Sequence, residues 1–319
     1  MNNNTQANNP EHDEAVVEAM PEKSRSVSVF AAFWREIKAD KKALVSLFVV
    51  LIIMIGSVIW ASTLDMQEVV DISPARLFNR RMPPSWQEGG SPGHFLGTDD
   101  GGRCVLSLMV FATRNSLFLG FGVAIISILI GVIIGIISGF YGGHVDNVMM
   151  RIVDTWSMLP GFMFMIALIQ LMPGFTIFGF MFILVAFTWM GRTRLIRGMT
   201  LQQANLDYVK ASKTLGTPNI VIIFREVMPN LVSIIAANVV LTMSGSIGIE
   251  TGMSMLGYGL PIDTPSLGTL LNNATLPANL QHRWWMWLPA VVLIFIMTMA
   301  INFLGQAVSR VADPRQRIA

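Results

Sequence analysis

The sequence predicts an all-α, polytopic membrane protein with six transmembrane helices. Of the 319 residues, 53% are hydrophobic and only 13% are charged, whereas soluble domains carry about 25% charged residues. The apolar residues form uncharged stretches that are long enough to cross about 30 Å of bilayer hydrocarbon. Because backbone amides in lipid must bond within the protein, we expect these stretches to be helices. The single cysteine, Cys104, excludes an internal disulfide and a multi-cysteine metal site.

The N-terminal residues precede the first apolar stretch. Residues 1–26 are rich in Asn and then acidic, which predicts a disordered cytoplasmic tail. No cleavable signal peptide is expected there. Residues 27–42 predict an amphipathic helix in the membrane interface, with a plain extension of the first span as the alternative. Its apolar residues are spaced at i, i+3, i+4 and i+7: Phe30, Phe33, Trp34 and Ile37.

Charged residues bound the expected spans. The first span is expected at 43–64, followed by an external loop at 65–114 and by spans two to six within 115–310. The uncharged stretch 155–191 is too long for one helix. Met172-Pro173-Gly174 in its middle predicts a tight hairpin of two spans, the first of which begins before Asp154. The other uncharged stretches are 115–143, 227–249 and 284–309.

The basic residues predict the orientation. With the N-terminus inside, 16 of the 22 Lys and Arg residues fall in inner segments and 6 in outer ones. Inner loops of membrane proteins carry the excess of positive charge. Both termini are therefore expected in the cytoplasm, including a tail at 311–319, and the even number of spans agrees.

One inner segment, 192–226, has the composition of a soluble protein. Its 35 residues exceed what a simple turn between two spans needs. The segment therefore indicates a docking surface for a cytoplasmic partner. On spacing alone, a solvated hairpin that only links two spans explains the pattern equally well.

Two short helices are expected in this segment. The first, 205–215, can be capped by Asn205 or Asp207, and Gly216 suits its C′ position. One face of it carries Tyr208, Ala211, Ser212 and Leu215, of which the two small central residues would let another surface approach closely. The second helix, 218–229, begins at Pro218 and ends at Met228-Pro229. Its apolar face is expected to carry Ile220, Ile223, Phe224 and Val227.

These residues resemble a known family. Lys210-Ala211-Ser212-x-x-x-Gly216, followed by Pro229, resembles the EAA loop of permeases of binding-protein-dependent ABC importers. Five further motifs are similar to the oligopeptide and dipeptide branch, and most nearly to its C-type oligopeptide permease subunits. They are Gly97-Thr98-Asp99-Asp100-x-Gly102-Arg103, Met150-Arg151-x-x-Asp154 with Pro160, Glu250 with Leu256-Gly257-Tyr258-Gly259, Thr264-Pro265-Ser266-Leu267-Gly268, and Asp313-Pro314-Arg315. The resemblance covers about residues 30–317. Lys210 replaces the family's glutamate, and Cys104 replaces an Asp that often follows Gly-Arg.

The resemblance implies a type I ABC importer permease fold and a transport subunit that is not an enzyme. No Walker A sequence occurs, so ATP and magnesium would bind partner subunits and this chain would hold no cofactor or metal. The implied partners are a homologous second permease in a heterodimer, two cytoplasmic ATPases and an external peptide-binding protein, in a bacterial cell membrane and without nucleic acid. The implied coupling residues are Tyr208, Lys210, Ala211, Ser212, Leu215, Gly216, Thr217, Pro218 and Pro229.

Small and charged residues in the spans have structural interpretations. Gly131, Gly135 and Gly139, spaced by four, predict close helix packing rather than a substrate contact. Asp154 and Glu250 are expected at span ends, where a charge reaches water or a partner rather than acting as a proton relay. Arg151 can pair with Asp154.

Other functions remain open at this point. A dipeptide or nickel permease of the same family is the first alternative. A secondary transporter would show paired repeats with broken helices, and no internal repeat is found. A membrane enzyme would need a nucleophile with its base or a metal cluster, but the four His residues are scattered, without HExxH or GxSxG.

Overall fold

The computed structural model describes residues 38, 40–74, 76–172 and 174–312. The expected tail at 1–26, most of the interfacial helix at 27–42 and the Asp313-Pro314-Arg315 motif lie outside the described residues. In the part that is described, every regular element is a helix, and an isolated bridge joins Thr98 to Cys104.

Five continuous helices are long and apolar enough to cross a membrane. They are α2 (Lys41–Thr63), α4 (Val105–Tyr141), α7 (Ile177–Ala204), the run of α9 (Asn219–Ile222), a π-helical turn (Ile223–Val227) and α10 (Met228–Met255), and α13 (Leu288–Ala312). A sixth candidate span is the pair α5 (Gly143–Ser157) and α6 (Gly161–Leu171), bent by 72°. The predicted all-α membrane fold is confirmed.

The bent pair corrects one expectation. Sequence analysis expected a single helix that begins before Asp154 and runs to the hairpin at Met172, but α5 ends at Ser157 and Pro160 caps a new helix. Proline has no amide hydrogen, and its ring disfavours a helical conformation for the preceding residue. The predicted hairpin break itself is confirmed, because α6 ends at Leu171 and α7 begins at Ile177.

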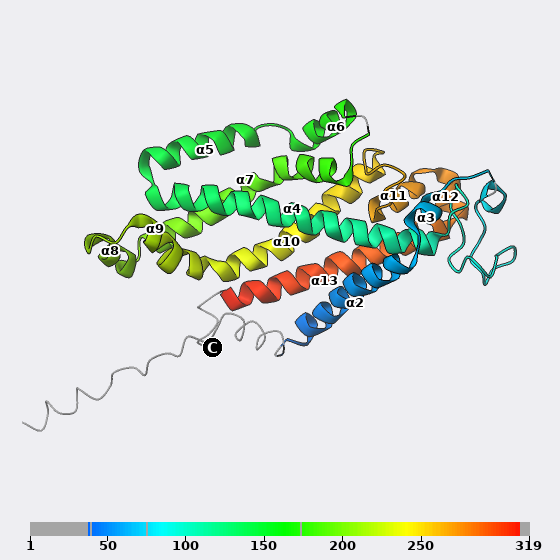
Figure 1. Ribbon diagram of the computed structural model, residues 1–319, viewed down its shortest axis with the longest axis horizontal. Coiled ribbons are helices and arrows are strands. Elements are labelled where there is room, and N and C mark those ends of the chain that lie inside the picture. The colour runs from blue at the N-terminus through cyan, green and yellow to red at the C-terminus, as the bar shows by residue number, and fades with distance from the viewer. Residues whose placement is uncertain (1–37, 39, 75, 173, 313–319) are drawn as a thin grey trace, which may run out of the picture.

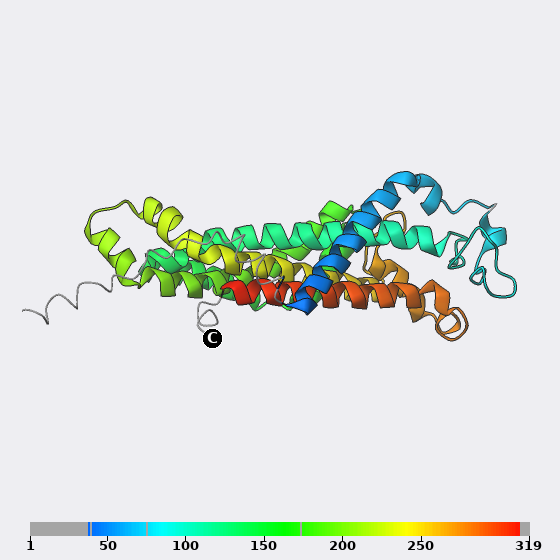
Figure 2. The same ribbon diagram turned by 90° about the horizontal axis from the view of Figure 1, so that it is seen from below.

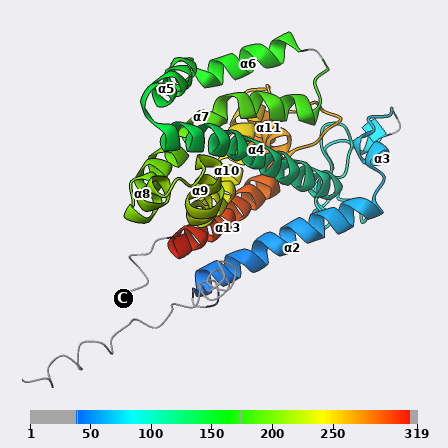
Figure 3. The ribbon, with the colours of Figure 1, turned by 60° about the vertical axis from the view of Figure 1, so that its left-hand side comes forward.

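The long helices pack around α4. Helices α4 and α7 share the most extensive contact, and α10 packs against both α4 and α13. Helix α2 lies across α13 and α4, obliquely to the other helices (Figure 2). The α5–α6 pair covers α7 on the side of the bundle away from α2 (Figure 3). Large apolar side chains such as Phe48, Ile52 and Ile59 stay exposed along α2, as a surface that faces lipid requires.

Short helices mark the two ends of the bundle (Figure 1). At one end, α8 (Asp207–Thr214) and α9 project beyond the long helices. At the other end lie α3 (Met66–Val70), α11 (Leu267–Asn272) and α12 (Pro277–His282), with 3₁₀ turns at Arg76–Asn79, Asn273–Thr275 and Trp284–Met286. The bundle therefore separates a projecting hairpin from a cap of loops and short helices.

Candidate functional site

The projecting hairpin, residues 205–230, begins with α8. The expected caps Asn205 and Asp207 do not cap it, because Leu206 occupies the N-cap position without a side-chain bond and Asp207 lies in the first turn. A carboxylate in the first turn still interacts favourably with the helix dipole. Val209 is the buried residue of α8, and the ammonium of Lys213 lies 4.2 Å from the centroid of the Phe140 ring of α4.

The end of α8 has the predicted geometry. Gly216 has φ +81°, a left-handed conformation that glycine adopts without strain. Its amide donates to the carbonyl of Lys213, and the amide of Thr217 donates to the carbonyl of Ser212, both at 3.1 Å. This pair of bonds is a Schellman motif, and it fixes the direction in which the chain leaves α8.

The second expected helix, 218–229, differs from the prediction. It starts after Pro218 as expected, but it runs through Pro229 into α10 without a stop. The π-helical turn Ile223–Val227 ends two residues before Pro229 and shifts the helical register. As a result Ile223 and Val227 of the predicted apolar face are buried, whereas Ile220 and Phe224 are 58% and 59% exposed.

Hydrogen bonds fasten α8 to the start of the next span. Ser212 Oγ donates to Glu226 Oε1 at 2.7 Å, and Asn230 Nδ2 donates to the Tyr208 hydroxyl at 3.0 Å. Val209 packs in a cluster with Ile222, Ile223 and Val227. Tyr208 and Ser212 are therefore partly used within the hairpin, and the predicted face of four residues is not a single free surface.

The rest of the predicted coupling set lies on the outside of the hairpin. Lys210, Ala211 and Leu215 are exposed, with Leu215 at 84%. Pro218 and Pro229 are exposed as well, and Thr217 is half-buried. Ala211 and Leu215, spaced by four residues, thus lie exposed on a helix that the hydrogen bonds above hold in place.

The glycine stripe lies in the α4–α7 contact. A Cβ added at Gly131 would lie 2.9 Å from Arg192 Cβ, and one at Gly135 would lie 2.9 Å from Ile196 Cβ. A Cβ at Gly139 would lie 2.7 Å from the Thr200 Cβ. These glycines allow the two helix backbones to approach closely.

Two ion pairs join the bent pair to α7. Asp154 accepts from Arg194 at 2.9 Å, so the expected pairing with Arg151 is wrong, and Arg151 is exposed. Asp146 accepts from Arg197 Nε and Nη2, each at 2.5 Å, and from Ser138. Sequence analysis missed Asp146, although an acidic residue after the paired glycines 142 and 143 is a first-turn signal.

Asp99 organises the outer motif. Its Oδ1 accepts from the amides of Gly101 and Arg103 at 2.9 and 2.8 Å, and its Oδ2 accepts from Arg103 Nε at 2.8 Å. Gly97 and Gly102 have φ values of +75° and +76°. The motif Gly97 to Arg103 is thus a closed turn, with the buried carboxylate of Asp99 at its centre.

The cap of the bundle holds this turn in place. Trp285 Nε1 donates to the carbonyl of Thr98 at 3.3 Å, and Asn279 Nδ2 donates to Asp100 Oδ2 at 3.1 Å. Asp100 also pairs with Arg81. Although desolvation opposes it, the Arg81 guanidinium and the Asn279 amide hold the pKa of Asp100 below its usual value. Trp285 itself is buried and acts here as a packing residue.

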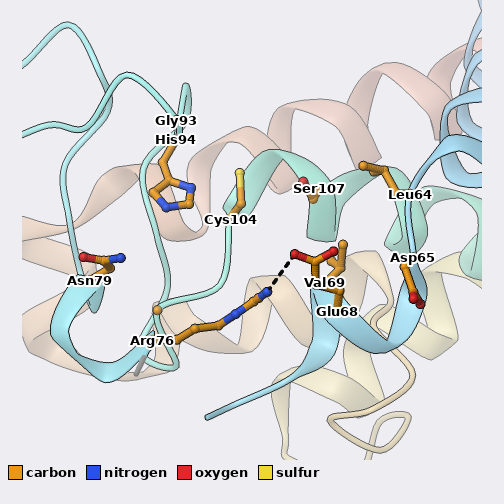
Figure 4. A pocket seen from close by; sticks show the side chains of 11 residues that line it. Leu64, Asp65, Glu68, Val69, Arg76, Asn79, Gly93, His94, Cys104 and Ser107 are labelled. Atoms are coloured by element: carbon orange, nitrogen blue, oxygen red, sulfur yellow. Dashed lines mark ion pairs between the residues drawn. The ribbon is translucent and has the colours of Figure 1, made fainter. Parts of the chain in front are cut away.

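A cavity of about 310 Å³ lies between α3, the loop that joins α3 to α4, and the start of α4 (Figure 4). Asp65, Glu68 and Arg76 line one side, and Glu68 pairs with Arg76 at 3.5 Å. His94 lines the cavity too; burial, with the Arg76 charge nearby, lowers the pKa of its imidazole below the usual 6.5. Cys104, the N-cap of α4, is half-buried on the same wall.

Glu250 corrects another expectation. The expectation that its charge reaches water or a partner is wrong, because its side chain is fully buried near the C-terminal end of α10. Hydroxyl groups of Ser116, Ser254 and Ser266 surround the carboxylate. Sequence spacing could not predict this enclosure, since Ser116 and Ser266 lie 134 and 16 positions from Glu250 along the chain.

Metal ligation finds no support in the described ranges. Within residues 38, 40–74, 76–172 and 174–312, no three His, Cys, Asp or Glu side chains are grouped as metal ligands. The features that remain are mechanical: a projecting hairpin, a long helix that continues from it, and a hydrogen-bonded cap.

Comparison with known proteins shows which family and which relatives the chain is similar to. Residues 131–318 match the family described as binding-protein-dependent transport system inner membrane component. The chain is 39% identical over 291 residues to the oligopeptide transport system permease protein OppC of Lactococcus lactis subsp. lactis (strain IL1403), covering 91% of this chain and 96% of that protein. It is 35% identical over 304 residues to the dipeptide transport system permease protein DppC of Bacillus subtilis (strain 168), covering 94% and 90%. It is 31% identical over 236 residues to the inner membrane ABC transporter permease protein YejE of Escherichia coli (strain K12), covering 74% and 66%.

Proposed function

This chain belongs to the family of binding-protein-dependent transport system inner membrane components, and from that premise we propose that it is the permease subunit of an ATP-driven oligopeptide importer. It is a multi-pass membrane subunit of a bacterial ABC importer and not itself an enzyme. Oligopeptides are favoured as substrates because the OppC relative is 39% identical over 91% of this chain. Dipeptides are the second candidate, favoured by the DppC relative at 35% identity.

The proposed assembly supplies what this chain lacks. Two cytoplasmic ATPase subunits would bind ATP and magnesium, a homologous second permease would complete the pathway, and an external binding protein would deliver the peptide. The positive charge bias favours an inner location for the hairpin and both termini. The outer loop would then face the binding protein.

The observation that carries the mechanism is the hairpin at the start of α9–α10. Helix α8 would sit in a groove of one ATPase through Lys210, Ala211 and Leu215, which are exposed. ATPase closure would push α8 as a rigid body. The Ser212–Glu226 and Tyr208–Asn230 bonds would pass that push to the span that begins at Asn219. Alternating access requires such a unit with two stable positions.

Affinity purification in mild detergent tests the assembly. The tagged wild-type chain should recover two ATPase chains and a second permease, and a lone chain with transport activity would contradict the proposal. Ala211→Trp should abolish recovery of the ATPases because the indole projects from the docking face of α8. Ala211→Ser is the matched control and should recover the full complex.

Peptide uptake tests the substrate. Membrane vesicles or proteoliposomes that contain the complex and its binding protein should take up labelled tetra- and pentapeptides, with excess unlabelled oligopeptide as competitor. If only dipeptides inhibited the uptake, the chain would belong to a dipeptide importer, the second candidate.

A further inference from the structure

A buried carboxylate joins three segments at the outer end of the bundle. Glu250 is 0% exposed. Its Oε1 accepts from Ser266 Oγ at 2.5 Å and from Ser254 Oγ at 2.8 Å, and its Oε2 lies 3.5 Å from Ser116 Oγ. Ser116 belongs to α4, Ser254 to α10, and Ser266 is the N-cap of α11. One side chain thus bonds two spans and a short helix of the cap.

Further bonds connect the same three segments. The amide of Leu267 donates to Ser116 Oγ at 3.1 Å, and Asn115 Nδ2 donates to the carbonyl of Pro265 at 2.8 Å. Asn272 Nδ2 donates to the carbonyl of Ser254, also at 2.8 Å. Residues 256–272 are here named the outer segment. It is attached to α4 and α10 before and at the start of α11, and to α10 again at the end of α11.

The first turn of α11 also packs against the Glu250 side chain with no space between them. A Cβ added at Gly268 would lie 2.7 Å from Glu250 Oε1 and 2.7 Å from Ser254 Oγ, closer than any real Cβ contact. Glycine at this position lets the first turn of α11 rest directly on the carboxylate. The arrangement tolerates no displacement of α11 toward α10.

Burial of a carboxylate is costly unless hydrogen bonds compensate it. A packed apolar side chain would hold two helices together without that cost. A hydrogen-bonded carboxylate differs because its bonds are directional and fix one position of the bonded groups. Helix α11 has only six residues, too few to be stable alone, so its position depends on the core packing of Leu267 and Leu270 and on these directional bonds.

We propose that Glu250 is a positioning residue that locks the outer segment to α4 and α10, so that movement begun at the projecting hairpin reaches the outer mouth of the permease. The inference rests on the proposed transport function. The span Asn219–Met255 is continuous and reaches from the hairpin to the opposite end of the bundle (Figure 1). Its inner end bonds α8 through Glu226, and its outer end carries Glu250. Through these bonds the outer segment moves together with α4 and α10.

The ratio of peptide transported to ATP hydrolysed tests this lock in the reconstituted complex. Glu250→Ala removes the carboxylate, and Gly268→Ala pushes α11 away from it. Both variants should lower the ratio about tenfold while ATP hydrolysis continues, because the outer segment no longer follows α10. Glu250→Gln keeps an oxygen that accepts from both Ser254 and Ser266, and it should restore the ratio to within about twofold of wild type.

Gly252→Ala is the matched control for Gly268→Ala. It adds the same methyl group to α10 two residues from Glu250, where nothing lies within 4 Å, and it should leave the ratio unchanged. Wild-type ratios in both Glu250→Ala and Gly268→Ala would overturn the proposal. Failure of the proposed function itself is distinguishable, since the wild-type complex would then transport no peptide.

A distance measurement tests the lock even if a variant transports nothing. In a Cys104→Ser background, spin labels at Ile262→Cys in the outer segment and Phe121→Cys on α4 occupy exposed positions, 69% and 54% accessible. The mean distance between the labels should be the same without nucleotide and in the vanadate-trapped complex. In Glu250→Ala the distribution of that distance should broaden. A distance that changes with nucleotide in the otherwise wild-type complex would overturn the proposal.

Discussion

At Gly216 the absence of a side chain decides the shape of the projecting hairpin. The residue has φ +81°, and its amide donates to the carbonyl of Lys213. Proline fixes φ near −65° and has no amide hydrogen, so it can adopt neither feature. Asparagine tolerates the left-handed conformation better than other non-glycine residues.

Gly216→Pro should therefore uncouple transport while the protein still inserts into the membrane. We expect peptide uptake to fall about tenfold or more, because the Schellman motif that directs α8 toward the next helix is lost. Gly216→Asn should keep uptake within about twofold of wild type. Uptake is measured at equal membrane abundance. Normal uptake by Gly216→Pro would show that the hairpin does not transmit the movement.

His94 should make the stability of the loop between α3 and α4 depend on pH. Burial and Arg76 lower the pKa of its imidazole below the usual 6.5, so the unfolded chain binds the proton more readily than the folded one. The stabilisation is complete above about pH 6.5 and is lost as pH falls from there toward the lower folded pKa. The other ionisable groups that line the cavity are Asp65, Glu68, Arg76 and Cys104.

The midpoint of thermal unfolding measures this effect in the purified protein. It should fall between pH 7.5 and pH 5.5 in the wild type. His94→Gln should reduce that fall, because glutamine keeps a polar group in the cavity without a titrating proton. Equal falls in the two proteins would remove His94 as the cause.

Among the helices, α5 depends on an ion pair for its attachment to α7. Asp146 bonds Arg197 twice and also accepts from Ser138, and its side chain is 12% exposed. The pair of Asp154 and Arg194, on the same two helices, has side chains that are 50% and 47% exposed. The two pairs join the same helices but differ in burial and in the number of bonds, so the exposed pair serves as the control for the buried one.

Asp146→Asn should destabilise the protein by about 1–3 kcal/mol, since it leaves a partly buried guanidinium without its charged partner. Asp154→Asn should cost no more than about 0.5 kcal/mol, because solvent screens an exposed pair. Reversible unfolding by denaturant in detergent micelles compares the two variants. Equal losses of stability would contradict the argument from burial.

Two prolines show how much of each element could be predicted from the sequence. Pro160 lies where α5 stops, and a new helix starts directly after it. Pro229 looked like a helix end, yet the span continues through it, with a π-helical turn just before it. Proline always removes one backbone donor, but whether the helix breaks or continues depends on packing. Ile222, Ile223 and Val227 supply that packing, and one sequence does not reveal it.

For the molecule as a whole, composition and span length were sufficient to predict the membrane fold. The buried polar contacts were not predictable in the same way. Glu250 bonds Ser116 and Ser266, which are separated from it by 134 and 16 positions along the chain. Such contacts depend on how helices pack, and hydropathy carries no information on packing partners. The charge bias is different, because it bears directly on the orientation of the whole chain.

That orientation leads to a prediction for the entire molecule: the hairpin and the outer loop lie on opposite sides of the membrane. Because Cys104 is the only cysteine, a Cys104→Ser background carries none. Phe78→Cys in the outer loop and Leu215→Cys after α8 then report the two sides, at positions 91% and 84% exposed. In sealed right-side-out vesicles, a membrane-impermeant maleimide should label Phe78→Cys and leave Leu215→Cys unlabelled until the vesicles are permeabilised. Labelling of Leu215→Cys in intact vesicles would place the hairpin outside the cell, where no ATPase could drive it, and the coupling mechanism would be lost.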